Sequence, residues 1–325
     1  MLAGVVIVAV FGFVLPRIAS YRDVLDVVQS LTRWEVTALL AATVLNIATF
    51  APPWMVALPR LGFPRAIVMT QSATAASSVL PGGEAIGVAL SFGMLRAWGY
   101  GRGLVAAAVA VLASFNVLVK ALFPVVAVAA LLATGAEVGT LGVIAAAGSA
   151  AALALVVVVG LALRGESSTR ALGERLDPLF ARLLRLLRKP ERQTVAERLV
   201  HFRREAIGLL GRRWASLALW TIVGNLTVFL VLLVTVRALG ITQVDTLEAF
   251  AAWSLARLLT AIPITPGGLG IVELGLTGAL VAAGADQASA VAAVLIYRAL
   301  TWLPPIVVGL PAVLVWRRLD KVAPS

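Results

Sequence analysis

The fold is decided by a short interruption in the second half of the chain, Thr265-Pro266-Gly267-Gly268-Leu269-Gly270-Ile271-Val272-Glu273. It separates two apolar runs, roughly 248–263 and 271–283, and each is shorter than the about 20 residues that a membrane-spanning helix needs. Proline removes a backbone donor and glycine supplies no side chain, so we expect no helix to continue through the Pro-Gly-Gly turn. The N–H groups of Gly268 to Ile271 would then form the open, partly positive end of the second short helix, where an anion fits.

The same type of interruption occurs earlier, at Leu80-Pro81-Gly82-Gly83-Glu84. A shift of 185 residues aligns its Pro-Gly-Gly turn with the later one, and the same shift aligns Gly99 with Gly284. Paired helix breaks in the two halves of a chain indicate the binding site of a membrane transporter. We therefore predict an inverted-topology repeat, with a first half over 1–134 and a second half over 139–318.

The composition indicates a membrane protein. Hydrophobic residues make up 61 % of the 325 residues and charged residues only 13 %, and the apolar runs are continuous rather than alternating, which excludes a porin-like barrel. The prediction is a single all-α polytopic membrane domain over 1–325, with six full spans and two broken or re-entrant helix pairs. The spans are expected at approximately 2–16, 34–58, 104–133, 139–163, 214–238 and 287–316, and the broken pairs at 66–80 with 84–97 and at 248–283.

The net charge of +11 is concentrated in one segment. Thirteen of the 27 Lys and Arg residues fall between Arg164 and Arg213, where arginines interleave with leucines in an amphipathic pattern typical of a helix on a membrane surface. A basic block could bind nucleic acid, but its place between spans favours anionic lipid headgroups. The positive-inside rule then predicts that 164–213 and both termini lie on the cytoplasmic side of the inner membrane.

Five ionisable residues fall within the apolar runs, where charge is costly and therefore informative. They are Glu84, Lys120, Arg257, Glu273 and Arg298. In one interpretation, Arg298 or Arg257 pairs with Glu273, and Lys120 pairs with Glu84, as ion pairs that hold helices together. In the other, Arg257 and Arg298 bind a phosphate together with the glycine-lined helix end, because the guanidinium fork matches phosphate oxygens. Both interpretations stay open, since a paired arginine can exchange its carboxylate for phosphate.

The predicted substrate-binding residues are Pro81, Gly82, Gly83, Glu84, Lys120, Arg257, Pro266, Gly267, Gly268, Gly270, Glu273, Tyr297 and Arg298. Further polar side chains in the apolar runs either line the same cavity or join helices by hydrogen bonds. These are Gln71, Ser72, Thr74, Asn116, Thr265 and Thr301.

Signatures of an enzyme are scarce. The chain has no cysteine and one histidine, His201, which lies in the basic segment. We find no catalytic constellation, no metal-ligand cluster and no nucleotide-binding loop, and we expect a transporter without a cofactor. Two alternatives stay open: a membrane-embedded glycosyl or lipid transferase that uses Asp23 or Glu84, and an ion-coupled transporter of a small soluble anion.

The motifs resemble a known family. The stretch Ile262-Pro263-Ile264-Thr265-Pro266-Gly267-Gly268-Leu269-Gly270-Ile271-Val272-Glu273 resembles the flippase-like membrane region of the lysylphosphatidylglycerol synthases. Tyr297-Arg298, followed by Trp302-Leu303-Pro304-Pro305 and Gly309, is similar to the final span of that family, and Leu80-Pro81-Gly82-Gly83 is similar to its first-half motif. One departure is that 85–90 contain no arginine, whereas many members carry one after a Gly-Glu that follows this motif.

The resemblance implies a membrane domain that moves a lipid headgroup between leaflets. In full-length synthases a soluble aminoacyl-transferase domain follows, and here the chain stops at Ser325, so we expect a stand-alone member that does not aminoacylate lipid. The expected function is that of a flippase for an anionic phospholipid or a polyprenyl-phosphate-linked lipid, working by alternating access. Its partners would be membrane lipids and not nucleic acid, and a homodimer is left open.

Overall fold

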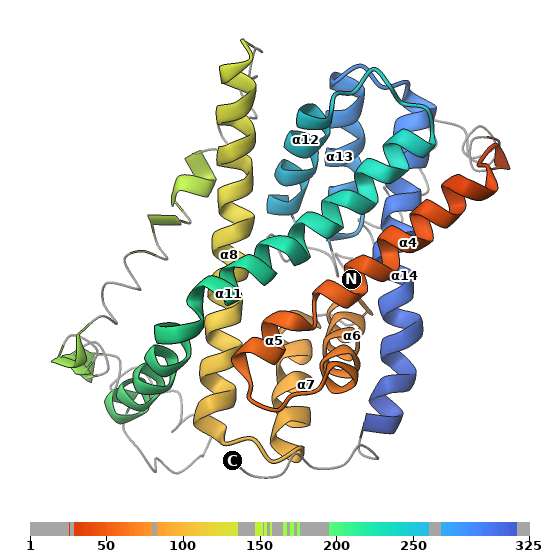
Figure 1. Cartoon of the computed structure of the whole chain (residues 1–325). Helices are drawn as coiled ribbons and strands as arrows, with labels where there is room; N and C mark the ends of the chain where they lie inside the picture. Colours follow the sequence, from red (N-terminus) through yellow and green to blue (C-terminus); the bar gives the residue numbers. More distant parts are fainter. Residues whose placement is uncertain are drawn as a thin grey trace.

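The computed structural model describes residues 29–79, 83–135, 195–259 and 268–316, together with Asp26 and scattered residues between 147 and 175. All regular secondary structure in these residues is helical (Figure 1). Four segments are long and apolar enough to cross a membrane: Arg33–Ala57, Arg102–Ala133, Arg213–Ala238 and Gln287–Leu314. The chain is therefore a helical membrane protein, as its composition predicts.

These four segments coincide with four of the predicted spans, those at 34–58, 104–133, 214–238 and 287–316. The span predicted at 2–16 lies outside the described residues, and the span predicted at 139–163 lies mostly outside them.

The first of these segments consists of two helices, α4 (Arg33–Thr49) and α5 (Pro52–Ala57). α4 begins at a capping box, in which the Glu35 carboxylate accepts the N–H of Thr32 at 2.7 Å and the Thr32 hydroxyl accepts the N–H of Glu35 at 3.3 Å. The helix does not continue into α5, because Pro52 has no N–H to extend the hydrogen-bond ladder.

Two pairs of short helices each precede a long helix. The first set is α6 (Phe63–Val79), α7 (Gly83–Ala97) and α8 (Arg102–Ala133), and the second is α12 (Thr246–Leu259), α13 (Ile271–Ala282) and α14 (Gln287–Val315). The predicted helix breaks therefore fall between α6 and α7 and between α12 and α13. The Pro-Gly pairs at 81–82 and 266–267 themselves lie outside the described residues.

The turns that follow α7 and α13 have the same geometry. Gly99 has a φ of 102° and Gly284 a φ of 99°, a region that glycine adopts without steric cost. In both turns, the N–H of the residue after the glycine donates to the carbonyl five residues before it, at 3.1 Å and 3.0 Å. Both short helices thus end in the same left-handed glycine cap.

The two sets of helices pack against each other crosswise. α6 packs against α14, and α12 packs against α8, so one short helix of each set contacts the long helix of the other. Figure 1 shows α8 and α14 running in opposite directions, with α6 and α7 near one end of the bundle and α12 and α13 near the other. The two pairs of short helices therefore enter the bundle from opposite ends.

α11 (Val195–Ala238) is one continuous helix of 44 residues. The sequence predicts a charged helix that leads to Arg213 and a span over about 214–238. The span is found at Arg213–Ala238, and the charged helix continues into it without a break. No proline occurs within the helix, so its polar first part continues directly into the apolar part. At the junction, Arg213 Nη1 donates to the Val56 carbonyl at 2.9 Å and fastens α11 to α5.

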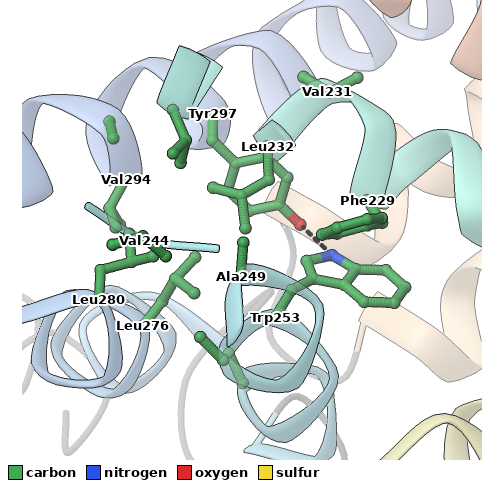
Figure 2. Packing of buried hydrophobic residues seen from close by; sticks show 14 of the residues in the cluster. Phe229, Val231, Leu232, Val244, Ala249, Trp253, Leu276, Leu280, Val294 and Tyr297 are labelled. Carbon is green, nitrogen blue, oxygen red and sulfur yellow. Dashed lines mark hydrogen bonds between the residues drawn. The ribbon is translucent and has the colours of Figure 1, made fainter. Parts of the chain in front are cut away.

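The larger hydrophobic core surrounds Trp253 of α12 (Figure 2). It contains Phe229 and Leu232 of α11, Leu276 of α13 and Tyr297 of α14. A second core fills the space between α5, α6, α7 and α8. The larger core fixes the relative positions of α12, α13 and α14, which carry the candidate site.

Candidate functional site

A buried ion pair joins α13 to α14. Glu273 lies in the first turn of α13, and its side chain is 1 % exposed. Its Oε1 accepts a hydrogen bond from Arg298 Nε at 2.7 Å, and its Oε2 accepts the N–H of Gly270 at 2.7 Å. The carboxylate therefore caps its own helix and holds an arginine of the next one. This is the pairing of Arg298 with Glu273 that the first interpretation of the sequence predicts.

The start of α13 differs from the open amide end that the sequence predicts. The N–H of Gly270 is already used by the Glu273 carboxylate. Gly268 and Gly270 both have positive φ angles, 70° and 90°, so glycine is required at both positions. A phosphate at this helix end would therefore meet a carboxylate as well as backbone amides.

Arg257 lies near the end of α12 and contacts α11. Its Nη2 donates to Asn225 Oδ1 at 3.1 Å, and its guanidinium carbon lies 5.7 Å from the centroid of the Trp253 ring. The indole thus offers a cation–π contact to the guanidinium. The structure therefore places Arg257 against an amide, whereas it places Arg298 against a carboxylate.

Asn225 is a site residue that the sequence analysis missed. It is 1 % exposed on α11, and its Nδ2 donates to Asn116 Oδ1 of α8 at 3.2 Å and to the Thr221 carbonyl at 2.9 Å. The available signal was the rarity of asparagine, which occurs only three times in the chain, each time in an apolar run. A polar amide in such a run has to find partners inside the protein.

Tyr297 links α14 to α12 through the core. Its hydroxyl accepts a hydrogen bond from Trp253 Nε1 at 3.2 Å, which Figure 2 shows as a dashed line. Both side chains are buried. The neighbouring Arg298 lies with its guanidinium carbon 5.8 Å from the Trp302 ring centroid. Arg257 and Arg298 thus each lie beside an indole ring. The hydrogen bond between Trp253 and Tyr297 connects α12 and α14, the helices that carry them.

The remaining predicted residues are less informative. Gly83 begins α7, where an added Cβ would lie 2.5 Å from the carbonyl oxygens of Ala76 and Ser77, so glycine permits the close contact of α7 with α6. Lys120 is partly buried on α8. Pro81, Gly82, Pro266, Gly267 and the side chain of Glu84 lie outside the described part of the chain.

Metal ligation finds no support in the residues that the structure describes. Among them, no group of three or more His, Asp or Glu side chains could hold a metal ion. The site offers guanidinium groups and amides, which donate hydrogen bonds to oxygen anions, and one carboxylate, which accepts them.

These features define a class: a helical membrane protein that holds two arginines and a buried glutamate on a pair of short helices and the long helix that follows them. The family model for the lysylphosphatidylglycerol synthase TM region matches residues 1–309 of the chain. The chain belongs to this family, which confirms the resemblance of the motifs. A search of curated proteins found no match.

Proposed function

We propose that the protein is a lipid translocase, which moves an anionic phospholipid or a polyprenyl-phosphate-linked lipid between the leaflets of the cytoplasmic membrane. The observation that carries the proposal is the position of Arg257 and Arg298 on α12 and α14 in a membrane domain of this family. Arginine is expensive within a bilayer and is kept there for function or for pairing. Its planar fork matches the oxygens of a phosphate.

In this proposal, the Arg298–Glu273 pair is the resting state of the site. The pair satisfies the arginine while no lipid is bound, at a distance of 2.7 Å. An entering phosphate offers the Arg298 guanidinium the same kind of oxygen acceptor, so that Arg298 exchanges its carboxylate for phosphate. Glu273 keeps its second hydrogen bond, to Gly270, during the exchange.

The proposed movement is alternating access between two inverted halves. Its support is that α8 and α14 begin 185 residues apart, at Arg102 and Gln287, follow the same glycine turns and run in opposite directions (Figure 1). Inverted repeats of this kind place the substrate near the membrane mid-plane, where one half moves against the other. We further propose six spans with both termini and the basic segment 164–213 in the cytoplasm.

The test is lipid movement in liposomes that contain the purified protein and a fluorescent phosphatidylglycerol. We expect the wild type to move the lipid and the double variant Arg257→Ala/Arg298→Ala to lose at least about tenfold in rate. A hydrogen bond to a charged group contributes about 1.5–3 kcal/mol, and about 1.4 kcal/mol corresponds to a factor of ten.

The matched control is Arg170→Ala, which removes an exposed arginine whose ion pair with Glu166 spans 3.6 Å. It should move lipid at the wild-type rate. Equal rates for the wild type and the double variant would refute the proposed role of the arginines.

Uptake of a water-soluble anion without lipid movement would favour an ion-coupled transporter. Product formed from a lipid acceptor, and lost in Asp23→Ala or Glu84→Gln, would favour a transferase.

A further inference from the structure

We infer that Asn225 is a positioning residue, which holds the Arg257 guanidinium for phosphate through a neutral amide relay that reaches Asn116 on α8. The inference rests on the proposed function, because it assigns a role to the site at which the lipid phosphate binds. It differs from the proposed function in that it concerns a residue that would not touch the lipid.

The hydrogen bonds fix the orientation of the Asn225 amide. Arginine can only donate, so Asn225 must turn its oxygen towards Arg257, and these atoms lie 3.1 Å apart. Its NH₂ group then faces two acceptors, Asn116 Oδ1 at 3.2 Å and the Thr221 carbonyl at 2.9 Å. A rotation of the amide by half a turn would replace all three contacts with donor–donor or acceptor–acceptor pairs. The relay therefore has one stable arrangement.

The relay is anchored at its far end as well. Asn116 Nδ2 donates to the Leu112 carbonyl one turn earlier on α8, at 3.2 Å, which leaves its oxygen directed at Asn225. Arg257 is also bounded by the Trp253 ring, 5.7 Å from its guanidinium carbon. The guanidinium is thus constrained by an amide from α11 and an indole from its own helix.

Asn225 differs from Glu273 in that it is a neutral acceptor for its arginine. Glu273 binds Arg298 with a full negative charge, and a phosphate must compete with that charge. Asn225 offers Arg257 one acceptor atom and no charge, so it orients the guanidinium without competing electrostatically for it. A carboxylate at position 225 would keep the acceptor for Arg257 and add a negative charge that competes with phosphate, while its second oxygen could not donate to Asn116 and Thr221.

The relay also joins the two sets of helices. Asn116 belongs to α8 of the first set, whereas Arg257 belongs to α12 of the second set, and Asn225 on α11 bridges them. A shift of α8 relative to α11 would therefore change the support of Arg257. The packing between the two halves would therefore control the orientation of the Arg257 guanidinium.

The experiment compares the wild type with Asn225→Asp in liposomes that contain increasing fractions of fluorescent phosphatidylglycerol. For Asn225→Asp we expect the half-saturating lipid fraction to rise at least tenfold while the maximal rate stays within twofold. The thermal midpoint in detergent should fall, because the two hydrogen bonds that the amide donates are lost. A purely structural asparagine would change the thermal midpoint and the maximal rate together, and would leave the half-saturating fraction unchanged.

The matched control is Asn46→Asp, which places the same charge at a second buried asparagine whose amide donates to Thr227 Oγ1 at 3.2 Å. It should leave the half-saturating fraction within twofold of the wild type. If Asn46→Asp raised the half-saturating fraction as much as Asn225→Asp does, the rise would come from any added charge in the membrane domain and not from the contact with Arg257. The inference would then be overturned.

A second measurement separates this inference from the proposed function. If the wild type moves no lipid, the proposed function fails, and the thermal midpoint is then measured with phosphatidylglycerol in mixed micelles and with inorganic phosphate. Stabilisation of the wild type but not of Asn225→Asp by either ligand supports the positioning role and shows whether a lipid headgroup or free phosphate binds. Equal shifts for both proteins overturn it. If the wild type moves lipid and Asn225→Asp has the same half-saturating fraction, the inference fails while the proposed function stands.

Discussion

Replacement of Glu273 by leucine should lower the free energy of unfolding by about 3–5 kcal/mol, the cost of leaving one partner of a buried ion pair uncompensated. The Glu273 side chain is 1 % exposed and that of Arg298 is 13 % exposed, so little water reaches the charge that remains. The substitution also removes the acceptor of the Gly270 N–H at the start of α13. The measurement is reversible unfolding in mixed micelles, titrated with a denaturing detergent.

The control is the double variant Glu273→Leu/Arg298→Leu, which removes both charges. It should be more stable than Glu273→Leu alone, because apolar residues can replace a buried pair at little cost. Glu273→Gln, which keeps an oxygen acceptor, should lose less than Glu273→Leu. The single variant Arg298→Leu completes the comparison. If the losses in free energy of unfolding of Glu273→Leu and Arg298→Leu add up to that of the double variant, the pair does not form.

The second large effect is expected at Gly309 of α14. An added Cβ would lie 2.2 Å from the Gln71 carbonyl oxygen and 2.8 Å from the Ala75 Cβ of α6, distances that the rigid helix backbones cannot accommodate. The Gly309 carbonyl also accepts a hydrogen bond from Ser72 Oγ at 3.3 Å across the same contact. Gly309→Ala should therefore destabilise the protein by about 1–3 kcal/mol through overpacking, measured by the same unfolding titration.

Gly278→Ala is the matched control for this prediction. Gly278 lies on α13, where an added Cβ meets nothing within 4 Å. The substitution should be neutral or stabilising, because alanine favours a helix over glycine by about 1 kcal/mol. If both variants were equally stable, α6 and α14 would not approach as closely as described.

The turns that end α7 and α13 could be predicted because single residues determine them. Gly99 and Gly284 end α7 and α13 in a conformation that other residues avoid, and both were visible as a pair at a fixed offset. The long apolar helices could be predicted from hydropathy, because it measures how favourably a run of side chains transfers from water into the membrane. The full length of α11 could not be predicted in this way, because a change from polar to apolar composition does not end a helix that lacks proline or a capping glycine.

The partners of the charged residues could be predicted only in part. The pair of Glu273 with Arg298 was one of two possibilities, since Arg257 lies in the same part of the sequence. The choice depends on the crossing of α13 with α14 and of α12 with α11, which sequence spacing does not specify. Asn225 was missed for the same reason, because its partners Asn116 and Arg257 are 109 and 32 residues away.

The most direct test of the central claim, that a phosphate-bearing lipid binds to the arginines of α12 and α14, is an experimental structure of the protein in nanodiscs that contain phosphatidylglycerol. We predict headgroup density within hydrogen-bonding distance of the Arg257 or Arg298 guanidinium, at membrane depth. Lipid density confined to the two surfaces of the bilayer, with both arginines enclosed by protein alone, would contradict it.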